Sequence, residues 1–227
     1  MNPRDRLALA LDVGDLDAAL ALLAQVEPWF GIAKVGFELY AEAGPAAFDE
    51  LHERGVRVFA DLKLHDIPNT VGRAARVLGR RGVEFLNFHA AGGEAMLRAG
   101  VEGLADGARD AGHAPPTALA VNVLTSDADA GAVPERLAVA AAAGCAGVVC
   151  AATDVAAARA AGLRTMVPGI RPAGASRDDQ ARVATPGAAI AAGADWLVVG
   201  RAVSGAADPA AAAEAVAREV AAAMESA

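Results

Sequence analysis

The 227-residue chain has few cysteines, no surplus of positive charge and no long apolar run, and each of these absences excludes a class of protein. A formal net charge of −8 argues against a general nucleic-acid binder, because such proteins present a basic face. Charged residues, glycine or proline interrupt every window of about 18 residues, so no membrane span is predicted. Residues 1–6 are polar and the apolar run after them ends at Asp12, which is not the pattern of a signal peptide. We expect a soluble, cytoplasmic protein.

The two cysteines, Cys145 and Cys150, lie in one apolar stretch. A buried, reduced pair is the favoured interpretation, over a disulfide or a metal site, in a chain that shows no sign of secretion.

Short β-rich segments alternate with alanine-rich helical segments along the whole chain. Alanine contributes 62 residues, which favours helices and close packing. We predict strands over residues 7–12, 32–36, 56–62, 85–89, 117–123, 147–150, 164–168 and 196–200. The predicted helices cover residues 16–26, 45–54, 69–81, 93–111, 133–143, 154–161, 186–192 and 208–226.

Eight β/α units without a break predict a parallel sheet with right-handed crossovers. At this length the economical α/β fold is a closed (β/α)₈ TIM barrel that forms a single domain over residues 1–227. A doubly wound open sheet is the alternative, and it is weakened because no GxGxxG motif follows the first predicted strand.

Polar residues gather where the predicted strands end, which is where the active site of such a barrel lies. Most strand interiors, by contrast, are apolar. The polar or turn-forming residues at these positions are Asp12, Lys34, Asp61, Lys63, His89, Asn122, Pro168, Gly200 and Arg201.

The densest signal is the segment DLKLHDIPNT at residues 61–70. Residues two apart on a strand share a face, so Asp61 and Lys63 project together. Lys34 on the neighbouring strand can face the same pocket, and Asp66 can supply the second carboxylate of a Lys–Asp–Lys–Asp array, in which opposite charges alternate. The alternative is a strand end with solvated charges and a helix start that contains proline. We expect Asn69 to cap the helix that follows Ile67-Pro68.

The longest irregular stretch is residues 169–185, rich in proline, glycine, serine and charge. A loop of this length in a compact barrel is usually functional.

These motifs resemble the orotidine 5′-monophosphate decarboxylase family. The segment at 61–70 matches that family's signature, and further matches follow in the family's order over nearly the whole chain. They are LALD at 9–12, AKVG at 33–36, LTS at 124–126, PGIRP at 168–172 and VGRAV at 199–203.

The resemblance implies roles for four charged residues. Lys63 would deliver a proton to C6 of the pyrimidine, and Asp61 would face the departing carboxylate. Lys34 and Asp66 would complete the charged array.

The resemblance also implies the contacts to substrate, in a homodimer whose subunits share their active sites. These are Asp12 and Lys34 at the ribose, Thr125 and Ser126 at the pyrimidine edge, Pro168 in the pocket, Arg171, Gln180, Gly200 and Arg201 at the 5′-phosphate, and Asp66, Ile67 and Thr70 reaching the partner's pocket. The loop at about 169–185 would be a mobile segment that closes over the phosphate.

The implied reaction is decarboxylation of orotidine 5′-monophosphate (OMP) to UMP and CO₂, the last step of de novo pyrimidine nucleotide synthesis, without a cofactor. We expect no metal, since His65, His89 and the two cysteines show no ligand spacing. One alternative is a metal-dependent sugar-phosphate decarboxylase or aldolase that resembles 3-keto-gulonate 6-phosphate decarboxylase. The other is a nucleotide-phosphate binder without catalysis.

Overall fold

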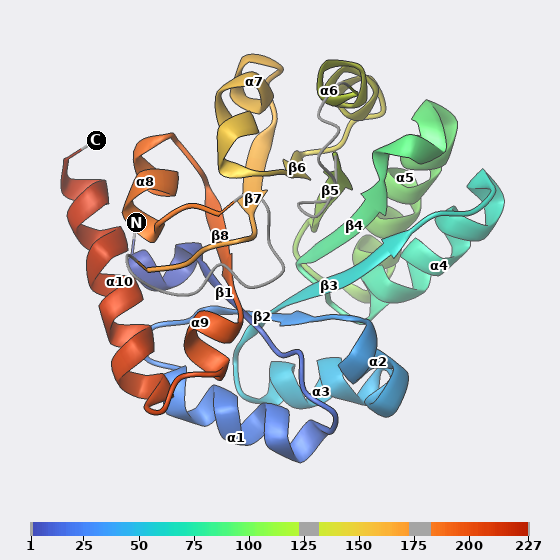
Figure 1. Cartoon of the computed structure of the whole chain (residues 1–227). Helices are drawn as coiled ribbons and strands as arrows, with labels where there is room; N and C mark the ends of the chain where they lie inside the picture. The colour runs from blue at the N-terminus through green and yellow to red at the C-terminus, as the bar shows by residue number, and fades with distance from the viewer. Residues whose placement is uncertain (1, 123–131, 173–182, 227) are drawn as a thin grey trace.

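The computed structural model describes residues 2–122, 132–172 and 183–226. Eight parallel strands form a closed barrel in sequence order, and the barrel closes where β1 pairs with β8 (Figure 1). This confirms the predicted (β/α)₈ barrel and excludes the open sheet. The strands are β1 (Leu7–Ala10), β2 (Ile32–Val35), β3 (Arg57–Leu64), β4 (Phe85–His89), β5 (Thr117–Val121), β6 (Gly147–Val149), β7 (Arg164–Val167) and β8 (Trp196–Val199).

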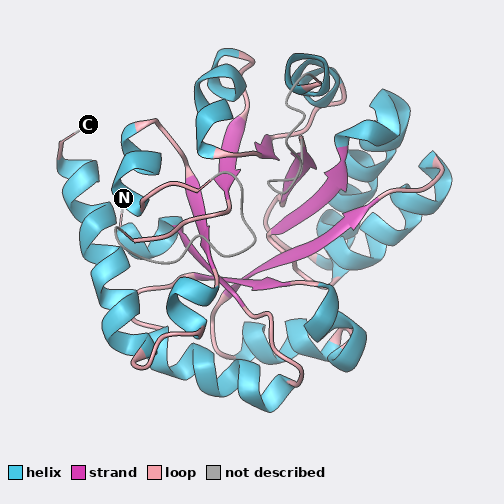
Figure 2. Cartoon of the chain, in the orientation of Figure 1, coloured by secondary structure: helices cyan, strands magenta, loops and turns pink. Residues whose placement is uncertain are grey.

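Helices surround the barrel on the outside (Figure 2). They are α1 (Leu16–Val26), α2 (Phe37–Ala43), α3 (Ala46–Glu53), α4 (Pro68–Arg80), α5 (Gly93–Ala111), α6 (Val133–Ala142), α7 (Val155–Ala160), α8 (Pro186–Ala191), α9 (Arg201–Ser204) and α10 (Pro209–Glu225). Short 3₁₀ turns are η1 (Pro3–Arg6), η2 (Ala90–Gly92) and η3 (Ala152–Asp154). None of the described helices is long and apolar enough to cross a membrane.

One helix was missed, and one local prediction is wrong. The helix expected over 45–54 is confirmed as α3, and the unpredicted helix α2, which has Gly44 as its C-cap with φ at 57°, precedes it. Helix α4 begins at Pro68 with Ile67 as its N-cap, so Asn69 lies inside the helix and does not cap it. Proline at the first helical position has its φ preset for a helix, which explains the earlier start.

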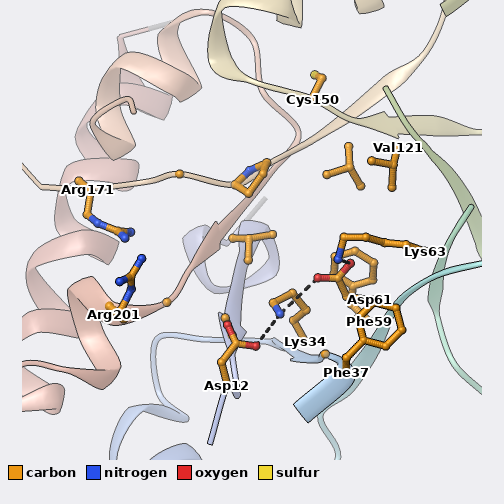
Figure 3. Close-up of a pocket in the computed structure, with 17 residues that line it drawn as sticks. Asp12, Lys34, Phe37, Phe59, Asp61, Lys63, Val121, Cys150, Arg171 and Arg201 are labelled. Carbon is orange, nitrogen blue, oxygen red and sulfur yellow. Dashed lines mark hydrogen bonds and ion pairs between the residues drawn. The ribbon is translucent and has the colours of Figure 1, made fainter. Parts of the chain in front are cut away.

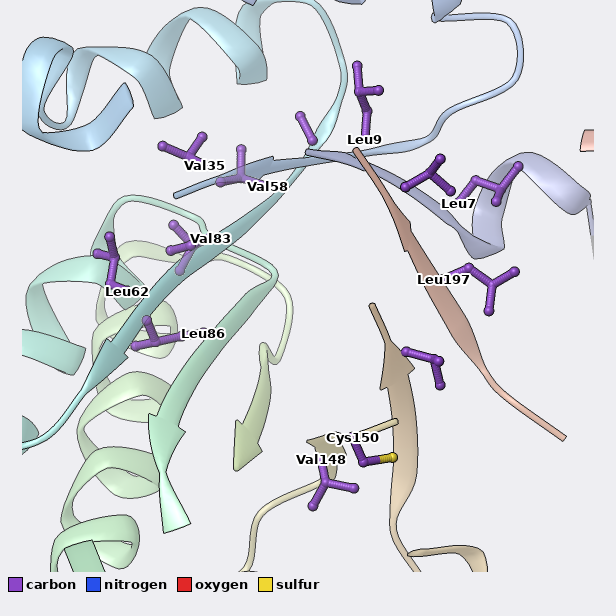
Figure 4. Close-up of a cluster of buried hydrophobic side chains, with 14 of the residues drawn as sticks. Leu7, Leu9, Val35, Val58, Leu62, Val83, Leu86, Val148, Cys150 and Leu197 are labelled. Atoms are coloured by element: carbon purple, nitrogen blue, oxygen red, sulfur yellow. The ribbon is translucent and has the colours of Figure 1, made fainter. Parts of the chain in front are cut away.

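The core has two apolar layers. The larger one lies between the barrel and the helices (Figure 4), and it includes both cysteines, which are buried and not joined by a disulfide, as predicted. Burial raises the pKa of the Cys145 thiol to about 12. The smaller layer fills the inside of the barrel with Ala8, Ala10, Ile32, Phe59, Phe85, Leu119, Met166, Trp196 and Val198.

The inner layer also fixes where polar groups enter the barrel. Ile32 on β2 and Phe59 on β3 belong to this layer. Lys34 and Asp61 follow two residues later on the same strands. Since side chains two apart share a face of a strand, both charged groups point into the barrel at its carboxyl end.

Helices α4 and α5 pack backbone against backbone. A Cβ atom added at Gly79 would overlap the carbonyl oxygen of Leu104, and one added at Gly107 would overlap that of Arg76. The chain accordingly has glycine where the two helices touch.

Candidate active site

A pocket of about 380 Å³ opens at the carboxyl ends of the strands. Its walls contain eight of the residues predicted for the site (Figure 3): Asp12, Lys34, Asp61, Lys63, Pro168, Arg171, Gly200 and Arg201. Apolar side chains complete the lining, among them Phe37, Val121, Val149 and Val198.

Four charged side chains form an alternating array on one side of this pocket. Lys34 Nζ lies 2.8 Å from Asp12 Oδ1 and 3.3 Å from Asp61 Oδ2. Lys63 Nζ lies 2.6 Å from Asp61 Oδ1. The predicted pairing of Asp61 with both lysines is confirmed, and within this chain Asp12 provides the second carboxylate of the array.

The middle of the array is withdrawn from water. The side chains of Lys34 and Asp61 are 9% and 14% exposed. Burial opposes the charged form of Asp61, but Lys34 and Lys63 outweigh it, so the pKa of Asp61 lies below its ordinary value. Burial likewise opposes the charge of Lys34, and Asp61 and Asp12 outweigh it, so the pKa of Lys34 is raised. Both groups are therefore ionised at neutral pH.

Lys34 and Lys63 are the only lysines in the sequence, which has 20 lysine and arginine residues in all. Every lysine ammonium group of the chain thus lines this pocket.

Asn87 on β4 supports the array, and the sequence analysis missed it. Its Nδ2 donates to Asp61 Oδ1 at 2.6 Å, and its Oδ1 accepts the backbone N–H of Lys63 at 2.7 Å. The signal was present: Asn87 is two residues from Phe85, which faces the barrel interior, so the polar side chain had to point inward.

The backbone at Lys63 is irregular. Its φ of 44° makes Lys63 the one non-glycine residue with a positive φ among those the structure describes. The pairing of β3 with β4 also shifts register between Ala60 and Leu64. The Lys63 ammonium lies 5.6 Å from the ring centre of Phe37, a second residue that the sequence analysis missed.

Arg171 and Arg201 lie across the pocket from Asp61 and Lys63 (Figure 3). Arg171 is buried, and its guanidinium donates to the carbonyl of Ile170 at 3.0 Å. Backbone bonds of Gly169 and Arg171 with Ala184 join the two ends of the predicted functional loop. The pocket thus has an array of both signs on one side and two guanidinium groups on the other.

The other predicted residues fall into two groups, one that the structure describes and one that it does not. Asp66, Ile67 and Thr70 are exposed, and Asp66 Oδ1 accepts the N–H of Ile67 at 2.6 Å. Thr125, Ser126 and Gln180, with most of the loop at 169–185, lie outside the described residues.

His65 and His89 lie beside the array, with ring centres 5.7 Å apart. Burial, and then the neighbouring charges of His65 and Lys63, lower the pKa of His89. In the part of the chain that the structure describes, no three His, Cys, Asp or Glu side chains converge as metal ligands do.

Comparison with known proteins agrees with this geometry. The sequence model of the Orotidine 5'-phosphate decarboxylase / HUMPS family matches residues 5–216. The chain is 46% identical to the orotidine 5'-phosphate decarboxylase of Moorella thermoacetica, over 97% of this chain and 94% of that protein. It is 48% identical to that of Anaeromyxobacter dehalogenans, over 96% and 99%.

Solved structures agree as well. The orotidine 5'-phosphate decarboxylase of Lactobacillus acidophilus superposes with a TM-score of 0.80 at 34% identity, covering 94% of this chain and 98% of that one. An uncharacterized conserved protein from Geobacillus kaustophilus superposes with a TM-score of 0.78 at 34% identity, covering 94% and 99%. The chain therefore belongs to the Orotidine 5'-phosphate decarboxylase / HUMPS family.

Proposed function

We propose that this protein decarboxylates orotidine 5′-monophosphate to UMP and CO₂, the last step of de novo pyrimidine nucleotide synthesis. The observation that carries the proposal is the Asp12–Lys34–Asp61–Lys63 array facing Arg171 and Arg201 across one pocket. Such a pocket suits a ligand with a reacting carboxylate at one end and a phosphate at the other. The relatives from Moorella thermoacetica and Anaeromyxobacter dehalogenans are orotidine 5'-phosphate decarboxylases, which supports the same substrate.

The chemistry requires a positive charge beside C6. When the bond between C6 and the carboxylate carbon breaks, its electron pair stays on C6 in an orbital orthogonal to the ring π system. Delocalisation therefore helps little, and a preorganised cation stabilises the developing charge. The Lys63 ammonium supplies that cation and then transfers a proton from Nζ to C6, which leaves a neutral amine, UMP and CO₂.

Asp61 acts on the carboxylate that leaves as CO₂. Its pKa lies below the ordinary value, because Lys34 and Lys63 outweigh burial, so it remains an anion. An anion facing the substrate carboxylate disfavours the bound substrate relative to the state in which CO₂ has left. Its ion pairs hold Lys63 next to the reacting carbon.

Arg171 and Arg201 are assigned to the 5′-phosphate with the backbone at Gly200. Guanidinium groups bind phosphate through paired charge-assisted hydrogen bonds, and the loops after the seventh and eighth strands hold phosphate in many barrels. That Gln180 and the loop at 169–185 close over the phosphate stays a prediction.

The test is a decarboxylation assay with purified protein. Loss of the ultraviolet absorbance of OMP, with release of one CO₂ per UMP formed, is the expected result, with and without EDTA. Turnover that EDTA abolishes and Mg²⁺ restores would point to the metal-dependent sugar-phosphate class. UMP binding without CO₂ release would identify a binder without catalysis.

We further propose a homodimer with shared active sites. Ile67 and Phe37 are 64% and 60% exposed, although both are large and apolar. Phe37 lines the pocket, and Ile67 follows four residues after Lys63, which lines it too. Asp66 and Thr70 flank Ile67 and are exposed too. A second copy of the chain would cover these residues and receive Asp66 at its pocket.

Subunit exchange tests this arrangement. Lys63→Ala and Asp66→Ala proteins, each inactive alone, should regain about a quarter of wild-type activity when mixed equally and exchanged, because half of the dimers are mixed and half of their sites are intact. A tagged-subunit pull-down checks the exchange. Confirmed exchange without any regained activity would place Asp66 in its own subunit's pocket.

A cytoplasmic location is proposed on the same basis. Cys145 and Cys150 are buried and not joined by a disulfide, which suits a reducing compartment.

A further inference from the structure

We propose that Asn87 is a positioning residue, which holds the Lys63 ammonium and the Asp61 carboxylate in the arrangement that the reaction needs. The kinetic part of this inference rests on the proposed function, whereas its structural part does not. Asn87 is fully buried between the barrel strands and does not line the pocket, so it acts through its neighbours.

The amide of Asn87 matches its two partners in polarity. The carbonyl end accepts the N–H of Lys63 at 2.7 Å, and the NH₂ end donates to Asp61 Oδ1 at 2.6 Å. An aspartate could accept but not donate when ionised, and a leucine of similar size could do neither. Asparagine therefore serves both partners without adding a charge to the array.

The first bond matters because of the backbone at Lys63. A positive φ is unfavourable for a non-glycine residue and persists only where the surroundings hold it. The register of β3 on β4 shifts between Ala60 and Leu64, and within this shift the N–H of Lys63 bonds to the side chain of Asn87. Asn87 thus stabilises the turn of the backbone that directs Lys63 into the pocket.

The second bond fixes the carboxylate. Asp61 Oδ1 receives both Asn87 Nδ2 and Lys63 Nζ at 2.6 Å, while Oδ2 faces Lys34 at 3.3 Å. Two donors on one oxygen set the rotation of the carboxylate about its Cβ–Cγ bond. Without Asn87, that rotation and the position of the Lys63 ammonium are less restricted.

Two variants separate the bonds. Asn87→Leu removes both of them, and we expect kcat to fall about 10²-fold, the size of loss that small misplacements of catalytic groups cause. The dissociation constant for UMP should change by less than about threefold, because the ribose and phosphate contacts lie elsewhere. A merely structural loss would lower the amount of folded enzyme without this separation of kcat from ligand binding.

Asn87→Asp keeps the acceptor for the Lys63 N–H and has a pH signature. Above the pKa of the introduced carboxyl, a second anion faces Asp61 and kcat should be low. Below it, the protonated carboxyl can donate to Asp61, so kcat relative to wild type should recover as the pH falls. This variant has nearly the size of asparagine, and it also serves if the leucine variant does not fold.

Thr165→Val is the matched control. Thr165 is fully buried near the opposite end of the barrel, where its hydroxyl bonds to Asp195. Loss of these two hydrogen bonds should lower Tm and leave kcat within twofold of wild type.

The two lysines provide a readout that does not depend on catalysis. Protein labelled with ¹³C-lysine gives only two sets of ε-methylene NMR signals, and Lys34→Arg assigns them. Asn87→Leu should move the Lys63 signal toward that of free lysine, and Thr165→Val should leave it in place. A Lys63 signal unchanged in both Asn87 variants, or a kcat within threefold of wild type in both, would overturn the inference. If wild type does not decarboxylate OMP, the proposed function fails and the NMR result alone decides the role of Asn87.

Discussion

Strand β3 carries a charged network at each of its ends, and the two networks are built differently. At its start Arg57 donates to the carbonyls of Asp5 at 2.7 Å and Gly31 at 3.4 Å, and pairs with Glu84 at 3.2 Å. At its end, Asp61 pairs with both Lys63 and Lys34. The first network joins chain segments through two backbone carbonyls and one ion pair, whereas the second joins charged side chains around a pocket.

Exposure separates the two networks further. The side chains of Arg57 and Glu84 are 32% and 35% exposed, against 9% and 14% for Lys34 and Asp61. Partly hydrated charges that tie loops together stabilise a fold at modest cost. Buried charges that tie no loop together are expensive, and they occur where chemistry requires them. The bonding partners of a charge network therefore indicate whether it stabilises the fold or serves a reaction, and its position on the strand does not.

The largest difference between the two ends of β3 is expected from Lys63→Ala, at the pocket end. Loss of both the proton donor and the cation beside C6 should lower kcat/KM at least ~10³-fold, with a far smaller change in UMP affinity. Steady-state kinetics and UMP titration measure the two quantities. A loss of tenfold or less would remove Lys63 from the mechanism.

The far wall of the pocket is tested by Arg201→Ala. Binding of phosphate-bearing ligands should weaken by about 2–4 kcal/mol if one charge-assisted contact is lost. Decarboxylation of orotidine, which lacks the phosphate, should hardly respond, and it serves as the control substrate. Equal damage with both substrates would show that Arg201 supports the fold instead.

The start of β3 should respond in the opposite way. Arg57→Met removes the bonds to Asp5, Gly31 and Glu84, and should lower the free energy of unfolding by about 1–3 kcal/mol. The value of kcat/KM should stay within about twofold of wild type, since Arg57 does not line the pocket. Urea denaturation measures the free energy of unfolding, and steady-state kinetics measure kcat/KM. A large loss of kcat/KM in fully folded Arg57→Met protein would show that this network also serves the reaction.

A smaller, pH-dependent effect should appear at both ends of the barrel. Burial lowers the pKa of His89 beside the pocket and of His52 on α3 below the ordinary 6.5. The unfolded chain therefore binds protons more readily, and stability should fall as the pH drops from about 7.5 to 5. His89→Gln and His52→Gln should each flatten this slope in urea denaturation, and the double variant should flatten it most. An unchanged slope in the double variant would refute the assignment.

Much of this architecture could be predicted because it depends on local patterns. The alternation of strands and helices predicted the barrel, and the spacing of Asp61 and Lys63 predicted their shared face. Closure between β1 and β8 was inferred from the number of units, since no local signal records a pairing of residues so distant in sequence. Helix α2 was missed because it is only seven residues long and directly follows a strand.

The supporting residues were harder to find than the charged ones. Asn87 stands in a segment of strong β character, FLNFH, where one polar residue has no visible partner until β3 is placed beside it. The positive φ at Lys63 has no sequence signal at all, because lysine is not a residue that favours it. Sequence patterns thus predicted which charged groups gather at the pocket and not what holds them in place.

The glycines between α4 and α5 set a limit on how this chain can change. In most helices alanine in place of glycine is stabilising by about 1 kcal/mol, and this chain uses alanine 62 times. At Gly79 and Gly107 a single methyl group would meet the backbone of the facing helix. The distance between the two helices is therefore fixed by backbone contact. Helix α4 begins four residues after β3 ends, so a shift of α4 would be transmitted to the end of β3. Substitutions that raise helix propensity must therefore leave Gly79 and Gly107 unchanged. Otherwise α4 would move away from α5 and displace the segment between Lys63 and Pro68.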